Sequence, residues 1–107
     1  MIITTTQDVP GMEIVEYRGL ATGEVVAGIN FLKDIGAGLR NFFGGRSQGY
    51  EDEIIQARLQ ALKELEERAA AMGANAVIGI RIDFDGLGNN GSNMLLVTVT
   101  GTAVVVR

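Results

Sequence analysis

Oxygen-bearing side chains gather around residue 85, at the end of a strand-like segment. Asp83 and Asp85 are followed by Gly86 and two asparagines, so carboxylate and amide oxygens recur closely. Such oxygens are the ligands that hard cations such as Ca²⁺ prefer. The spacing departs from a calcium loop, because Leu87 and Met94 stand where oxygen ligands belong. Two interpretations stay open: solvated aspartates, or a weak hard-cation site completed by several subunits.

A second motif overlaps the first. Residues 86–91, GLGNNG, match the dinucleotide-binding pattern G-x-G-x-x-G. That fingerprint requires a helix after the glycines, because the helix N-terminus holds the pyrophosphate. The residues that follow here, MLLVTVTGTAVVV, are typical of a strand, and Asn90-Gly91 is typical of a hairpin turn. We therefore interpret the motif as a hairpin loop.

A glycine-rich junction precedes the longest helical pattern and contains Gly44, Gly45, Arg46 and Ser47. Backbone N–H groups of such a junction can hold an anion, and Arg46 would add a positive charge. A plain loop in which Ser47 caps the helix also accounts for these residues. The acidic residues at 51–53 would repel a highly charged phosphate. The four junction residues are the candidate ligand-binding residues.

The chain of 107 residues has no cysteine and no histidine. Thiolate and imidazole are the preferred ligands of soft metals and the usual groups for nucleophilic and proton-transfer catalysis. No cofactor can be named, and no metal residue is assigned beyond the weak candidates Asp83 and Asp85. A carboxylate-based enzyme of unknown reaction stays as the alternative to a binding or scaffold protein, although no carboxylate pair is framed by apolar residues.

The charge pattern limits the classes of partner. The net charge is −4, from 13 acidic and 9 basic residues, and the basic residues are scattered singly. Nucleic-acid binding needs a basic stripe, so we expect no such partner. No stretch reaches the roughly 18 apolar residues of a membrane-spanning helix, and the N-terminus lacks a signal-peptide pattern. We expect a single cytoplasmic domain over residues 1–107 with no membrane partner.

A long helix and the strand after it must position the candidate residues. Apolar positions at three- and four-residue steps predict a helix that ends at Gly73. Its predicted buried face consists of Ile55, Leu59, Leu62, Leu65, Ala69 and Met72. A strand follows whose two-residue alternation predicts an apolar face of Ala76, Ile78, Ile80, Ile82 and Phe84. We expect this face to cover the helix. Glu64 and Arg68, four residues apart, are spaced for an ion pair.

Other segments complete an α+β pattern. Strands are predicted at 2–6, 12–27 and 93–106, and a short helix at 31–43. Gly19 and Gly23 suggest a bulge or bend in the second strand, and Gly101 suggests a bulge in the last. The prediction is an antiparallel sheet packed by one long and one short helix.

The apolar content points to self-association. Hydrophobic residues make up 47% of the chain, and the mean hydropathy is +0.22. Both faces of the segment 93–106 carry apolar residues, which is unusual for the outer strand of a lone small sheet. We therefore expect burial against another copy of the chain.

Five segments carry a likeness to a known family: ITTTQ near the start, the region of Gly19 and Gly23, FFGGRSQGYE at 42–51, MGANAVIGIRID at 72–83 and VTVTGTAVVV at 97–106. With them the chain resembles the YbjQ-like family, which is labelled heavy-metal-binding. The resemblance implies a dodecin-like α+β fold and a ring-like homo-oligomer, a pentamer, in which several subunits contribute strands to a shared β-barrel. No metal site is carried over, because the four methionines are weak substitutes for thiolate or imidazole.

These observations combine into one expectation. We expect a homo-oligomeric binding or scaffold protein that holds a small ligand at subunit boundaries, through the backbone of the loop 44–49 and through Arg46. A metal-binding protein with oxygen ligands stays as a further possibility.

Overall fold

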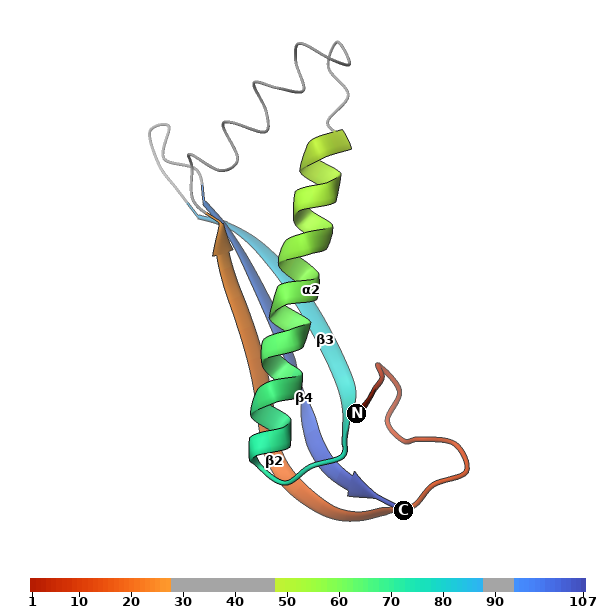
Figure 1. Cartoon of the computed structure of the whole chain (residues 1–107). Coiled ribbons are helices and arrows are strands. Elements are labelled where there is room, and N and C mark those ends of the chain that lie inside the picture. The colour runs from red at the N-terminus through yellow and green to blue at the C-terminus, as the bar shows by residue number, and fades with distance from the viewer. Residues whose placement is uncertain (28–47, 88–93) are drawn as a thin grey trace.

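The computed structural model describes residues 1–27, 48–87 and 94–107. Its elements in chain order are β1 (Ile2–Ile3), β2 (Ile14–Ala27), α2 (Gln48–Ala71), β3 (Ala76–Leu87) and β4 (Met94–Val106). The strands form one sheet in the order β1-β3-β4-β2, and α2 lies across one face of it (Figure 1). This confirms the α+β class, the long helix and the strand after the hairpin. The short helix predicted at 31–43 lies outside the described residues.

The sheet is mixed, whereas we predicted an antiparallel one. β2 and β3 both pair antiparallel with β4, but β1 pairs parallel with β3, with Ile2 opposite Ala76. The backbone of Thr4 continues this contact, because its N–H donates to Val77 O at 2.9 Å and its C=O accepts from Ile80 N at 3.1 Å. The direction of a two-residue edge strand depends on a partner more than 70 residues away. Local alternation carries no information about it.

The buried face of α2 matches the predicted one only in part. Leu65 and Ala69 are fully buried, and Leu62 and Met72 pack against the core, as predicted. The fully covered positions of α2 recur every fourth residue at Ala57, Ala61, Leu65 and Ala69. By contrast, Ile55 and Leu59 are 40% and 51% exposed. The reason is the close approach of helix and sheet: a Cβ on Gly23 of β2 would lie 2.0 Å from the carbonyl oxygen of Ala61. Such an approach requires small residues at the contact, so alanine occupies the covered side.

A bulge in β3 divides its apolar residues between two faces. The register shifts between Ile78 and Arg81, and Gly79 has a φ of 60°. Ala76 and Ile78 consequently face away from α2, whereas Ile80 faces the core beneath it. The prediction of a single apolar face from 76 to 84 was wrong at this point.

The glycines of the other strands have distinct roles. Gly19, with a φ of 123°, lies at a register shift of β2, which confirms the predicted bulge there. Gly23 lies in unbroken register and serves the contact with α2. The bulge predicted at Gly101 is instead in the partner strand β3, because the shift from Ile78 to Arg81 occurs opposite Gly101.

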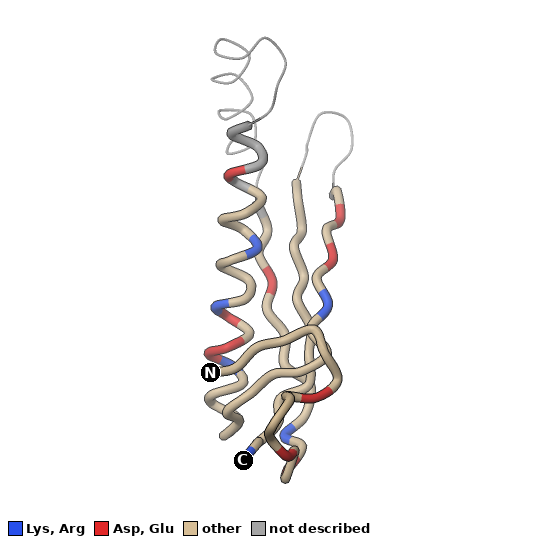
Figure 2. Tube along the Cα trace, turned by 90° about the vertical axis from the view of Figure 1, so that its right-hand side faces the viewer, with Lys and Arg blue, Asp and Glu red and all other residues tan. Residues whose placement is uncertain are grey.

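Two apolar clusters hold the described structure together. The larger lies between α2 and the sheet and includes Leu65, Val97 and Val99. The smaller lies on the opposite face, where Val9 and Ile14 pack over the lower half of the sheet. Figure 2 shows α2 on one side of the sheet, with the upper half of the other side bare in the described part of the chain. The sheet is therefore covered unequally.

Candidate functional site

The candidate anion-binding residues Gly44, Gly45, Arg46 and Ser47 lie outside the described residues. Their role stays a prediction of the sequence.

The candidate cation residues Asp83 and Asp85 lie on β3 and are exposed on the face away from α2. Asp83 Oδ1 lies 3.6 Å from Arg81 Nε, in an exposed ion pair. Directly across on β4 stand Thr98 and Leu96, which bring no further carboxylate. Asp83 and Asp85 therefore have the surroundings of solvated aspartates.

The described ranges 1–27, 48–87 and 94–107 contain no group of three or more acidic side chains placed to hold a metal ion. The full sequence also lacks cysteine and histidine, the donors that a soft metal prefers. The described residues therefore supply no donor set that fits a heavy-metal centre.

An apolar surface runs along the flank of α2 that points away from β2. It consists of Ile55, Leu59 and Leu62 on α2 and Phe84 on β3, and we call it the α2 surface. Leu62 is two residues from Glu64, which contacts β2, so the helix places them on opposite flanks. Phe84 pairs with the buried Val97 and shares its face, yet remains 43% exposed. Leu62 is partly buried against the core, whereas Ile55, Leu59 and Phe84 expose apolar side chains on the α2 surface.

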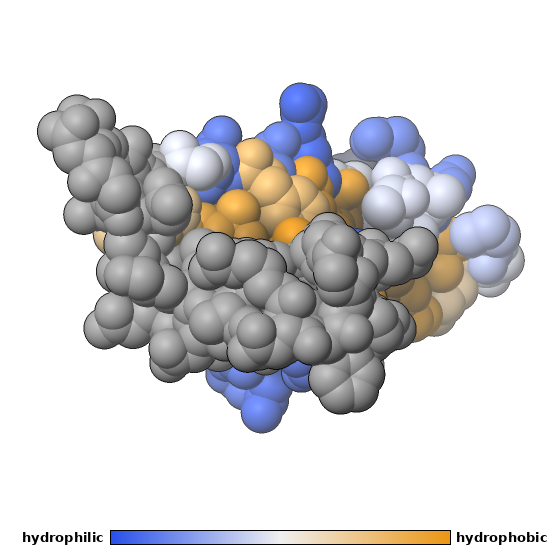
Figure 3. Space-filling view, turned by 90° about the horizontal axis from the view of Figure 1, so that it is seen from above, coloured by the Kyte–Doolittle hydropathy of each residue, from blue (hydrophilic) through white to orange (hydrophobic). Residues whose placement is uncertain are grey.

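A second apolar surface lies on the other side of the sheet, and we call it the helix-free surface. It consists of Tyr17, Leu20 and Val26 on β2 and Leu96 on β4. Tyr17 and Leu20 are 68% and 70% exposed. Their neighbours on β4, Val104 and Thr102, belong to the face opposite α2. In Figure 3 hydrophobic atoms crowd the upper end of the sheet, with hydrophilic side chains projecting around them.

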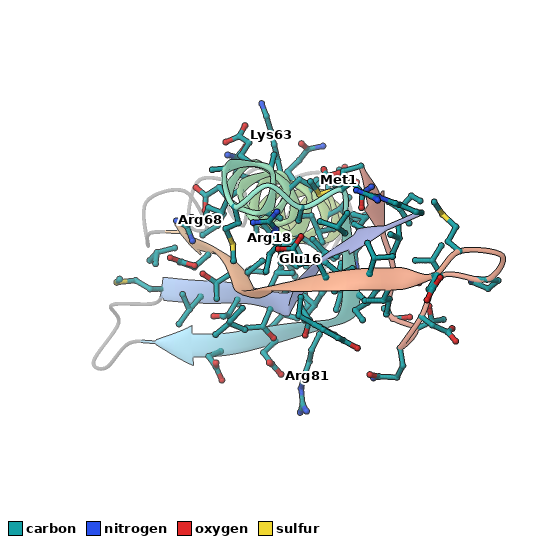
Figure 4. The ribbon with its side chains drawn as sticks, turned by 90° about the horizontal axis from the view of Figure 1, so that it is seen from below. Met1, Glu16, Arg18, Lys63, Arg68 and Arg81 are labelled. Carbon is teal, nitrogen blue, oxygen red and sulfur yellow. The ribbon has the colours of Figure 1, made fainter. Side chains whose placement is uncertain are left out.

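Charged residues border both surfaces. Arg58, Lys63 and Glu66 lie on α2 close to the α2 surface, whereas Asp83 and Asp85 border the helix-free surface together with Arg81. Figure 4 shows Lys63 and Arg81 projecting in opposite directions, one from the helix side and one from the bare side. The surfaces therefore belong to opposite sides of one protomer.

A third feature is a polar cluster where α2 meets the outer edge of β2. Arg68 Nη1 donates to Thr22 O at 3.0 Å and forms an ion pair with Glu24 Oε2 at 3.0 Å. Glu64 Oε2 accepts from the backbone N–H of Glu24 at 3.2 Å. The hydrogen bond with Glu24 and its charge raise the pKa of Arg68 above its ordinary value, so the guanidinium stays charged.

The sequence predicted only part of this cluster. The predicted pair of Glu64 and Arg68 is present, with their charged atoms 3.9 Å apart. The contacts with β2 join residues 40 and more positions apart. Periodicity within the helix contains no signal for them.

No helix in the described ranges is long and apolar enough to cross a membrane.

Together these features define a small α+β protein, in which the described residues form one helix on a mixed sheet with exposed apolar surfaces on both sides. A family model described as "Putative heavy-metal-binding" matches residues 1–107. The chain belongs to this family, the YbjQ family, as its sequence motifs indicated.

Individual relatives agree with this assignment. A UPF0145 protein of Listeria ivanovii is 62% identical over 107 residues, which is 100% of this chain and 96% of the relative. One from Listeria monocytogenes is 61% identical with the same coverage. A crystal structure from Pediococcus pentosaceus, of a protein with unknown function in the DUF74 family, is similar with a TM-score of 0.70 and 18% identity. It covers 100% of this chain and 98% of that one, and supports the fold.

Proposed function

We propose that this protein is a homo-oligomeric ring whose subunits associate head to tail, the α2 surface of one subunit against the helix-free surface of the next. The observation that carries the proposal is that one protomer exposes apolar side chains on both sides of its sheet, among them Leu59 and Leu20. Exposed apolar groups gain about 25 cal/mol for each Å² removed from water, so both surfaces favour burial.

Symmetry distinguishes the possible assemblies. A twofold dimer joins identical patches, so it buries one of these surfaces and leaves the other in water. A head-to-tail contact buries both and closes into a ring when the rotation between subunits allows it.

The number of subunits and the ligand extend this proposal. We propose five subunits, from the resemblance on which the sequence analysis drew. The ring holds a small anionic ligand at subunit boundaries, through Arg46 and the glycines of residues 44–49, and serves as a binding or scaffold module in the cytoplasm. A shared β-barrel stays an alternative way of closing the ring, in which strand edges pair instead of faces.

Mixing two variants tests the head-to-tail contact. Leu59→Asp damages only the α2 surface, and Leu20→Asp damages only the helix-free surface. We expect each variant alone to be a monomer. An equal mixture should form a one-to-one heterodimer and nothing larger, because only one undamaged contact remains. Mass spectrometry under native conditions measures the assembly and, on the wild type, the subunit number and any bound ligand.

The control is Gln60→Asp, which adds the same charge at the next, exposed position of α2. It should keep the wild-type assembly. A twofold dimer through the α2 surface would leave the Leu20→Asp variant dimeric and would contradict the proposal. Wild-type assembly size in both single variants would also contradict it and favour a barrel built from strand edges.

A further inference from the structure

The outer edge of β2 carries backbone groups that could pair with another strand. β2 ends the strand order, so in the described part of the chain its outer edge faces no further strand. The N–H of Glu24 and the C=O of Thr22 both receive side-chain contacts from α2. Because they are two residues apart, these groups point to the same edge, away from β4. An added strand would use them.

An exposed edge of this kind favours aggregation of the protein. β2 is 14 residues long, and Leu20 and Val26 on it are exposed and apolar. A long apolar edge strand is a template for pairing with further copies of the same chain. Pairing at such an edge can continue without closing, in contrast to a ring.

Side chains of α2 cover this edge at its centre. The close contact between Gly23 and Ala61 brings the helix within reach of the strand edge. There the guanidinium of Arg68 donates a hydrogen bond to the carbonyl of Thr22, and the carboxylate of Glu64 accepts one from the N–H of Glu24. An incoming strand would have to displace a guanidinium and a carboxylate that are paired with each other. The guanidinium is also paired with the carboxylate of Glu24.

We propose that Glu64 and Arg68 form an edge guard, which keeps β2 from pairing with a strand of another copy of this chain. The guard goes beyond the proposed ring, since it acts on the strand edge and not on the two apolar surfaces. It confines self-association to contacts between faces.

The test compares two double variants with equal changes in charge. Glu64→Ala with Arg68→Ala removes the guard. Lys63→Ala with Glu67→Ala removes one base and one acid at the same spacing, from exposed neighbouring positions. Hydrogen exchange reports the amide of Glu24. Sedimentation over a concentration series, with thioflavin T fluorescence, reports added strands.

We expect the guard variant to exchange the Glu24 amide at least about tenfold faster than wild type, as loss of one hydrogen bond to a charged group predicts. It should also form thioflavin-positive species that are larger than the wild-type assembly and grow with concentration. The control variant should match wild type in both measurements.

Faster exchange with an unchanged size distribution overturns the proposal, because an uncovered edge would then recruit no strand. Unchanged exchange overturns it too. If circular dichroism shows that the double variant does not fold, Arg68→Met decides by the same criteria, since it keeps the aliphatic stem and removes only the guanidinium. If the proposed ring is wrong, the mixing experiment with Leu59→Asp and Leu20→Asp will show it instead, because both of these variants keep Glu64 and Arg68.

Discussion

The two faces of the sheet are built from the same strands but have opposite relations to their surroundings. On the face toward α2, small residues such as Gly23 and Ala61 allow the helix to approach closely, and Val97 and Val99 are fully buried. On the other face the N-terminal segment covers only the lower half, and Leu20 above it is 70% exposed. One face therefore stabilises the protomer, and the other is available for contact with a second molecule.

The difference lies in side-chain size as much as in polarity. The covered face combines alanines of α2, Gly23 of β2 and valines of β4, so an atom added at Gly23 would meet the backbone of α2. The helix-free surface carries leucine, valine and tyrosine without a partner in the described residues. Substitutions on the two faces should consequently differ in their effect on folding.

The largest effect is expected for Gly23→Val. Its Cβ would lie 2.0 Å from the carbonyl oxygen of Ala61, a backbone atom that moves only if α2 moves. We expect a loss of more than about 4 kcal/mol in unfolding free energy, or loss of a cooperative transition. Urea denaturation followed by circular dichroism measures it. Gly86→Val is the matched control, because nothing lies within 4 Å of its Cβ position; an equal loss there would refute the close contact.

A smaller effect is expected for a leucine pair on α2. Leu65→Ala empties a fully buried position and should cost about 3 kcal/mol. Leu59→Ala, at a half-exposed position of the α2 surface, should cost below about 1 kcal/mol at protein concentrations low enough to keep the chain monomeric. Denaturation at low concentration compares the two. Similar costs would show that α2 buries its other flank, as the periodicity alone had predicted.

The smallest effect is expected for Arg81→Ala on the helix-free side. Its ion pair with Asp83 spans 3.6 Å between two exposed side chains. Exposed pairs of this kind are worth about 0.5 kcal/mol or less, because water screens both charges. The thermal midpoint of the separate subunit should therefore stay close to that of wild type. A clear destabilisation would mean that the helix-free side is packed within the protomer.

Sequence periodicity predicted the long elements because each repeats its signal many times. α2 has three- and four-residue apolar steps from Ile55 to Ala69, and apolar residues alternate with other residues along much of β3 and β4. The same method missed the switch at Gly79, because one extra residue in a strand changes the face of every residue before or after it. It also chose Ile55 and Leu59 for the buried side of α2, because it ranks large side chains above small ones.

Local sequence patterns also do not reveal which distant residues surround the candidate sites. Asp83 and Asp85 were found from their type and spacing, but the structure gathers no third carboxylate beside them. Of the polar cluster between α2 and β2, the sequence predicted only the pair of Glu64 and Arg68. Their partners Glu24 and Thr22 belong to a strand that is distant in the chain.

The amino-acid sequence by itself determined the class of fold, the order of its long elements, the lack of soft-metal donors and the family to which the chain belongs. These depend on composition and on patterns that repeat within a few residues. Only the tertiary structure decided which flank of α2 is buried, the direction of β1 and the closure of the β2 edge by Glu64 and Arg68. Each of these depends on contacts between residues far apart in the chain, whose distances no local pattern contains.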